Sequence, residues 1–193
     1  MTIHTEHPFA DAGGDRDPVR RLRGRLAGRV TLWTTGASAD DPARTGLTVS
    51  SVMVAGGEPG EILGLVDPDS DLGADLEPGR RIAVSLLDWR HRQLADAFAG
   101  VSPAPGGPWR LSRWTGADRP PVPAGCSTYA LAEVVDLTEV GWSLLVRATV
   151  TSVHVYTYAD DEGAPEEPDG SGGDGELIHH RGRYRRLAPP GGA

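Results

Sequence analysis

Several residue types and patterns are scarce or missing in this 193-residue chain, and each absence excludes a class of protein. Cys126 is the only cysteine, which excludes an intramolecular disulfide and any metal or redox pair of the Cys-x-x-Cys kind. A single thiol is typical of a reducing compartment. No run of eighteen apolar residues occurs, and Glu6, Asp11 and Asp15 interrupt the stretch where a signal peptide needs apolar residues. We therefore expect a soluble, cytoplasmic protein.

Lysine is absent, so all nineteen basic side chains are arginines, against 27 acidic residues and a formal net charge of −8. This excess has a local origin, because residues 160–176 hold eight acidic residues and no basic one. Removing these eight from the 27 leaves nineteen acidic residues against nineteen arginines. A balanced body with one acidic segment argues against a nucleic-acid partner, since a phosphate backbone requires a basic surface.

Glycine and proline are abundant, at 26 and 16 residues, which indicates many turns and short elements. From Arg29 onward, short β-rich segments alternate with Gly, Pro and Asp, a pattern typical of a β-barrel or sandwich. We expect a mainly β fold, in which the last two strands form a hairpin across residues 139–141. The expected strands are 29–35, 46–54, 61–66, 80–87, 127–137 and 142–157.

Three short helices are expected beside the strands. The first begins at Pro18, because Asp17 is a good N-cap and apolar residues then recur at helical spacing, namely Val19, Leu22 and Leu26. We interpret its arginines as a solvated face rather than a phosphate or membrane patch, since no aromatic residue anchors the apolar face. The other two helices are expected over 70–76 and 90–98.

The domain organisation follows from the same composition. We expect one domain over residues 16–187, with a flexible N-terminal tail at 1–15 and a C-terminal tail at 188–193. Residues 159–175 are rich in Gly, Pro and acidic residues and lack any β-branched residue, so they are expected to form a disordered insertion.

The strand at residues 46–51 combines glycine with hydroxyl side chains. Alternation along a strand places Thr48 and Ser50 on one side and Val49 and Ser51 on the other. Hydroxyls and backbone amides of this kind bind a phosphate or the polar edge of a flavin without a fixed charge. Solvation or pairing across the sheet is the structural alternative, and it is the commoner role of such residues.

Four segments, in this order, resemble those of the flavin reductase-like domain family of FMN-binding split β-barrel proteins. They are residues 46–51 (GLTVSS), similar to a G-x-T-x-S-S strand, 82–87 (IAVSLL), 93–99 (QLADAFA), and 179–184 (HHRGRY), similar to a closing H-R-G-x-Y element. Each segment alone is common enough to occur by chance, but four in the same order are not.

The resemblance implies an FMN-binding split barrel and a homodimer with the flavin near the subunit interface. It further implies a set of residues that contact the flavin or its phosphate, namely Thr48, Val49, Ser50, Ser51, Ser70, His180 and Arg183. Two departures stand out: Asp71 follows Ser70 where the family often has a basic residue, and Val140-Gly141-Trp142 replaces the Gly-Asp-His of flavin-reducing members. Trp142 either covers a flavin face or fills the local core.

The function implied by the resemblance is an NAD(P)H:flavin oxidoreductase that supplies diffusible reduced flavin to a separate flavin-dependent monooxygenase. No catalytic residue is assigned, because the flavin ring accepts hydride from NADH or NADPH without an essential acid or base. The missing Gly-Asp-His motivates an alternative, a flavin carrier or vestigial member without reductase activity. A split barrel that binds a deazaflavin or haem, and a structural protein without a ligand, are further alternatives.

The remaining reactive side chains are expected to be structural. Cys126 has no base beside it in any recognisable pattern and reads as a small buried residue. His91 opens a helix and His154 lies within an otherwise apolar strand. No spacing of His, Asp, Glu and Cys predicts a metal site, and no membrane partner is expected.

Overall fold

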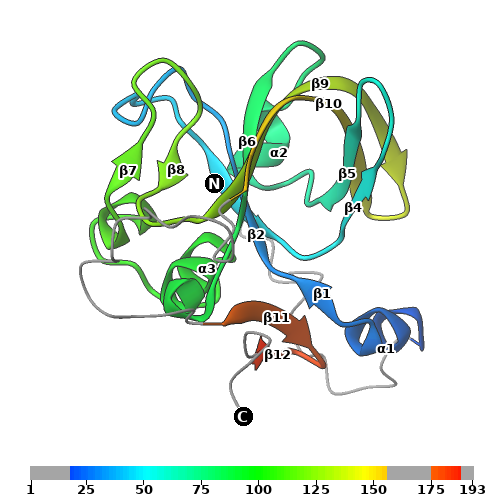
Figure 1. Ribbon diagram of the computed structural model, residues 1–193. Helices are drawn as coiled ribbons and strands as arrows, with labels where there is room; N and C mark the ends of the chain where they lie inside the picture. The colour runs from blue at the N-terminus through cyan, green and yellow to red at the C-terminus, as the bar shows by residue number, and fades with distance from the viewer. Residues whose placement is uncertain (1–17, 156–174, 188–193) are drawn as a thin grey trace, which may run out of the picture.

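A computed structural model of the protein describes residues 18–155 and 175–187. The predicted tails at 1–15 and 188–193 lie outside these residues, as does the predicted insertion at 159–175 apart from Gly175. A strongly curled β-sheet forms the centre of the molecule, and short helices pack around it (Figure 1). The prediction of a mainly β fold is confirmed.

The central sheet has seven strands in the order β3-β2-β6-β9-β10-β5-β4, and every neighbouring pair is antiparallel. Its strands are β2 (Thr31–Thr34), β3 (Gly46–Val49), β4 (Val52–Ala55), β5 (Glu61–Val66), β6 (Arg81–Leu86), β9 (Thr128–Val140) and β10 (Ser143–Val155). β3 and β4 are consecutive in the chain but stand at opposite edges of the sheet, so the sheet must curl until its edges meet. The backbone N–H of Leu65 donates to the carbonyl of Ser51 at 3.0 Å, next to this junction.

The helices and the long hairpin confirm several predictions. The helix expected at 70–76 is α2 (Asp71–Asp75), with Ser70 as N-cap and Leu76 as C-cap. The one expected at 90–98 is a 3₁₀ turn, η1 (Trp89–His91), followed by α3 (Arg92–Phe98). β9 and β10 pair as the predicted hairpin, although β9 runs to Val140, further than expected.

Three short elements between α3 and β9 were absent from the prediction. They are η2 (Pro108–Leu111), β7 (Trp114–Thr115) and β8 (Val122–Pro123). Each is too short to carry a periodic pattern, and η2 and β8 contain prolines. Packing orders η2 and β7 instead, because Trp109 and Trp114 contact Phe98 of α3 edge-on at centroid distances of 5.0 and 5.8 Å. β8 pairs with β7 and buries Val122.

Strand β2 is buried on both sides, because it lies between two hydrophobic cores. Trp33 points into the barrel, where its ring packs against Gly64, and a Cβ at Gly64 would lie 2.6 Å from that ring. Leu32 points the other way, into a core beneath α3 that includes Leu94 and Phe98. The barrel interior and the α3 core therefore share one strand, which fixes α3 relative to the barrel.

A second sheet of three strands, in the order β1-β11-β12, lies beside α1 (Figure 1). Its strands are β1 (Gly28–Arg29), β11 (Glu176–His180) and β12 (Arg183–Leu187). Helix α1 (Pro18–Arg25) begins at Pro18 as predicted but ends before Leu26. The N–H of Val30 donates to Leu177 at 2.9 Å, and the N–H of Arg181 donates to Gly24 at 2.6 Å. The hairpin of β11 and β12 (the closing hairpin) is thus held against the segment that leads into β2.

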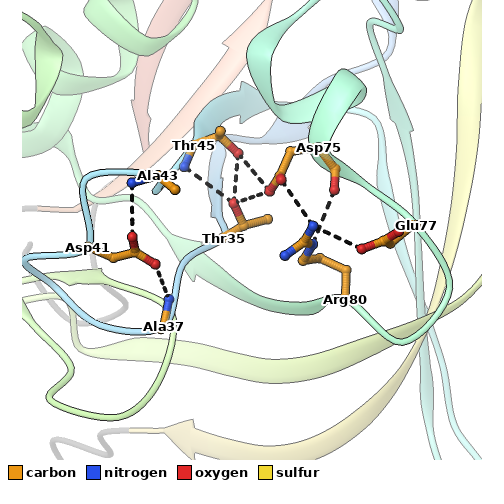
Figure 2. Close-up of polar contacts among 8 residues, drawn as sticks. All are labelled: Thr35, Ala37, Asp41, Ala43, Thr45, Asp75, Glu77 and Arg80. Atoms are coloured by element: carbon orange, nitrogen blue, oxygen red, sulfur yellow. Dashed lines mark hydrogen bonds and ion pairs between the residues drawn. The ribbon is translucent and has the colours of Figure 1, made fainter.

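Asp75, in α2, connects three parts of the fold (Figure 2). Its Oδ2 accepts a hydrogen bond from Thr35 at 2.6 Å and a longer one from Thr45 at 3.5 Å. Arg80 lies 3.2 Å from its Oδ1 and also donates to its backbone carbonyl at 3.1 Å. One partly buried carboxylate therefore joins α2 to both ends of the loop between β2 and β3.

The Asp75 carboxylate should contribute measurably to the stability of the fold. Replacing Asp75 by Ala removes the carboxylate acceptor of the Thr35 and Thr45 hydroxyls and one of the acceptors of Arg80, so we expect the free energy of unfolding to fall by about 2 kcal/mol. Urea denaturation measures this change. Glu77→Gln is the matched control, because Glu77 contacts the same arginine at 3.0 Å on an exposed surface and should cost less than about 0.5 kcal/mol. Equal losses in the two variants would contradict the role given to Asp75.

Candidate functional site

The junction between β3 and β4 presents two hydroxyl groups at the seam where the barrel closes. The carbonyl of Ser51 accepts from Leu65, and the carbonyl of Ser50 lies against Gly28 of β1, where a Cβ would come within 2.6 Å of it. Both serines are partly exposed, and among the described residues neither hydroxyl takes part in a hydrogen bond. The fold uses their backbone and leaves their side-chain polar groups available to a ligand.

Thr48 and Val49, the other predicted residues of this segment, direct their side chains into the protein. The hydroxyl of Thr48 donates to the carbonyl of Ala95 in α3 at 2.7 Å. Val49 is buried in the barrel, and its carbonyl accepts from the Thr31 hydroxyl at 2.7 Å. The strand ends at Val49, so the predicted alternation does not continue into Ser50. A ligand would meet Thr48 and Val49 through the backbone edge of β3, which is an edge strand of its sheet.

Ser70 caps helix α2. Its hydroxyl accepts from the N–H of Gly73 at 3.0 Å and donates to the carbonyl of Asp67 at 2.6 Å. Asp71 follows directly, and the Asp67 carboxylate accepts from the N–H of Asp69 at 3.0 Å. A phosphate at Ser70 would have to share a hydroxyl that already donates its proton, beside three carboxylates.

Trp142 stands at the tip of the β9–β10 hairpin and is 84% exposed. This exposure excludes the interpretation of Trp142 as a local core residue. Leu144 pairs with Val66 across the sheet, so the tip lies at the same end of β5 as the loop that leads to Ser70. Ser51, Ser70 and Trp142 therefore gather around one end of β5.

The closing hairpin carries its two adjacent histidines on opposite faces. His179 pairs with Gly28 and with Tyr184, whereas His180 pairs with Arg183. Directly paired residues share a face, so His179 lies on the face of Gly28, where Ser50 approaches. His180 and Arg183 lie on the other face of the small sheet. Both histidines lie in the segment that resembles the family's closing element, and His180 was predicted to contact the ligand; only the register with β1 shows that the two lie on opposite faces.

The surroundings of His179 favour its neutral form. The pKa of its imidazole is lowered, mainly by burial and further by the electrostatic effect of Arg23 and His180. Its ring meets Tyr184 edge-on at 6.1 Å. Burial raises the pKa of the Tyr184 phenol, and the neighbouring Asp96 raises it further, so this residue stays protonated. Both shifts favour the uncharged forms of His179 and Tyr184.

Other reactive side chains lie apart from this junction. Cys126 is buried, its thiol contacts the carbonyls of Leu86 and Thr128 at 3.4 and 3.3 Å, and burial raises its pKa. The Nδ1 of His91 accepts from the N–H of Asp88 at 3.1 Å. Within residues 18–155 and 175–187, no three His, Cys, Asp or Glu side chains are grouped as metal ligands, and no helix is long and apolar enough to cross a membrane.

Comparison with known families identifies the chain over most of its length. A family model described as the flavin reductase like domain matches residues 23–188. No curated protein sequence gives a significant match.

Solved structures share the architecture at low sequence identity. Flavin reductase PheA2 in its native state gives a TM-score of 0.71 at 20% identity, covering 91% of this chain and 100% of that one. The NADH:FAD oxidoreductase SgcE6 of Streptomyces globisporus, in complex with NAD and FAD fragments, gives 0.68 at 22%, covering 90% and 93%. BorF, the flavin reductase component of a bacterial two-component tryptophan halogenase, gives 0.66 at 22%, covering 89% and 99%. The predicted split barrel is confirmed.

The contact between Gly28 and Ser50 yields a prediction with a matched control. A Cβ at Gly28 would lie 2.6 Å from a backbone oxygen, so Gly28→Ala should destabilise the fold by about 1–3 kcal/mol and displace the junction. Gly24→Ala meets nothing within 4 Å and lies in a helix, where alanine should stabilise by up to about 1 kcal/mol. Thermal denaturation distinguishes the two, and a neutral Gly28→Ala variant would show that this contact is not tight.

Proposed function

This chain belongs to the flavin reductase-like domain family, and on that basis we propose that it is an NAD(P)H:flavin oxidoreductase that binds FMN at the β3–β4 junction. The observation that carries the proposal is the pair of serine hydroxyls at the barrel seam, which make no hydrogen bond within the described residues. The family match supports the proposed flavin reduction. The arrangement of Ser50 and Ser51 supports the proposed location of the flavin. FAD is the alternative flavin, since the similar protein SgcE6 is described as acting on FAD.

The residues at the junction suit a flavin. The isoalloxazine ring carries uncharged carbonyl and N–H groups along one edge, which hydroxyls and backbone amides can pair without a formal charge. Ser50, Ser51 and the edge of β3 supply such groups. A bound flavin would supply the hydride chemistry, and the protein supplies binding, orientation and exclusion of water.

Trp142 and the loop at Ser70 would then form the rim of the site. We propose that Trp142 covers an exposed face of the flavin, because a large aromatic ring at a solvent-exposed hairpin tip has apolar area available for stacking. The carboxylates around Ser70 disfavour a phosphate dianion there, so any contact of Ser70 with the ligand would be through the backbone. Thr48 and Val49 contribute through the edge of β3. His180 and Arg183 would contribute only from the opposite face of the small sheet.

A non-catalytic flavin carrier is the second candidate, and one observation favours it. Val140-Gly141-Trp142 occupies the position where flavin-reducing members of the family carry Gly-Asp-His. Reduction needs the nicotinamide to stack beside the flavin, and an exposed tryptophan at that position would compete with it.

As a reductase, the protein would serve a partner enzyme. BorF, which is similar in structure, is described as the reductase component of a two-component halogenase. We propose that this protein likewise supplies diffusible reduced flavin to a separate flavin-dependent monooxygenase or halogenase.

The proposed assembly is a homodimer, and helix α1 supports it. Val19, Leu22 and Leu26 are 63–69% exposed, and no residue of α1 is buried. At 100° per residue Val19 and Leu22 share one face of α1, roughly opposite Gly24, whose carbonyl accepts from Arg181 of the closing hairpin, and Leu26 follows directly after the helix. An apolar helix face turned away from its own subunit is suited to pack against a second copy.

Ligand binding and turnover test the function together. At a hundred times its dissociation constant, FMN should stabilise the protein by about 2.7 kcal/mol, which a thermal shift detects. Loss of nicotinamide absorbance with FMN and either NADH or NADPH should follow. A flavin complex that stays oxidised under excess of both nicotinamides would support the carrier instead. Absence of a shift with both FMN and FAD would contradict either candidate, and the absorbance of protein from its native host would then reveal a deazaflavin or haem.

The dimer has its own test. Leu22→Glu places a charge on the exposed apolar face of α1 and removes a leucine whose burial contributes about 2 kcal/mol, so the dimer dissociation constant should rise more than about tenfold. Analytical ultracentrifugation measures it. Val101→Glu is the control, because Val101 is equally exposed at 72% but lies beyond α3. A dimer unaffected by Leu22→Glu, or a monomeric wild type, would contradict this interface.

A further inference from the structure

We propose that His179, which is not the histidine of the family's closing motif, positions the flavin together with Ser50. The two residues would form a hydrogen-bonding pair for the uncharged polar edge of the isoalloxazine ring. This inference rests on the proposed function and adds to it a residue and the part of the ligand that the residue recognises.

The geometry of the small sheet brings the two residues to one point. His179 lies directly opposite Gly28, and such pairs have Cβ positions about 4.5–5.5 Å apart. Gly28 has no side chain, and the position its Cβ would take lies 2.6 Å from the carbonyl oxygen of Ser50 and 4.0 Å from its Cβ. His179 and Ser50 therefore face the same position on β1 from two different elements.

Neighbouring side chains hold the His179 ring in place. Tyr184 is its cross-strand partner on β12 and meets it edge-on at 6.1 Å, with an interplanar angle of 74°. Tyr184 itself packs against the core beneath α3, next to Asp96. A ring fixed by packing loses little further freedom when it binds a ligand, which is what a positioning residue requires.

The residues around His179 favour its neutral form, which suits the uncharged polar edge of the isoalloxazine ring. The groups that act on it are Arg23 of α1 and His180 of its own strand, and both oppose its protonation. A neutral imidazole carries one donor nitrogen and one acceptor nitrogen, and a serine hydroxyl both donates and accepts. The pair can thus satisfy adjacent carbonyl and N–H groups of a flavin without bringing a charge to the ring.

His180 is a matched control for His179. It is also partly exposed and adjacent in sequence, but it shares the opposite face of the sheet with Arg183. The family motif aligns with His180, whereas the register with β1 assigns the junction to His179. If His179 contacts the flavin, His179→Ala should weaken flavin binding more than His180→Ala. If His180 contacts it, the order should be reversed.

The test compares His179→Ala, His179→Asn and His180→Ala by titration with FMN and with riboflavin, which lacks the phosphate. His179→Ala should raise the dissociation constant of both flavins about tenfold, the effect of losing roughly one hydrogen bond. His180→Ala should change it less than about twofold. Asparagine keeps one donor and one acceptor, so His179→Asn should recover part of the loss. Circular dichroism and melting temperature establish that each variant is folded.

A second readout does not depend on any variant's stability. The ring-proton NMR signal of His179, assigned by its absence from the His179→Asn spectrum, should shift when FMN is added to the wild type, and that of His180 should not. Unchanged affinity in His179→Ala, or a larger loss in His180→Ala, would overturn the inference while leaving flavin binding intact. Failure of the wild type to bind either flavin would overturn the proposed function together with it.

Discussion

Closure of the barrel at residues 50–51 is the constraint on which the rest of the structure depends. The two edge strands of the sheet follow one another in the chain, so two residues must cross the seam between them. The carbonyl of Ser51 accepts from Leu65 and that of Ser50 lies against Gly28, whereas neither hydroxyl takes part in a hydrogen bond among the described residues. The same closure brings the end of β5, the β9–β10 tip and the small sheet to one region. The seam is therefore the place where we propose the ligand site.

Much of this fold could be predicted from the sequence, because its strands carry local signals. Turn residues bounded the segments, β5 was predicted with its observed bounds, and Ser70 was recognised at the start of a helix. The elements at 108–123 were missed, since each is two to four residues long; η2 and β7 are ordered by aromatic packing on α3, and β8 by pairing with β7 and burial of Val122. The spacing of apolar residues along the sequence indicates helices and strands, but it does not indicate contacts between separate elements.

The site was harder to predict than the fold, for the same reason. The strand pattern placed Thr48 and Ser50 on one face, but Thr48 is engaged by α3, whose position depends on the shared core at β2. The choice between His179 and His180 depends on pairing with Gly28, in a two-residue strand 151 positions earlier in the chain. The exposure of Trp142 was equally inaccessible, because a tryptophan beside a turn has the same local sequence whether buried or exposed. The sequence indicates which residue types could bind a flavin. The direction of each side chain depends on the register between strands, which the sequence alone does not give.

The central claim is that the barrel seam at Ser50–Ser51 is a flavin site, and a crystal structure of the protein with bound FMN tests it most directly. The account predicts density for the isoalloxazine ring at the β3–β4 junction, with its polar edge within hydrogen-bonding distance of the Ser50 or Ser51 hydroxyl. Flavin bound elsewhere, with both hydroxyls facing only solvent, would contradict it.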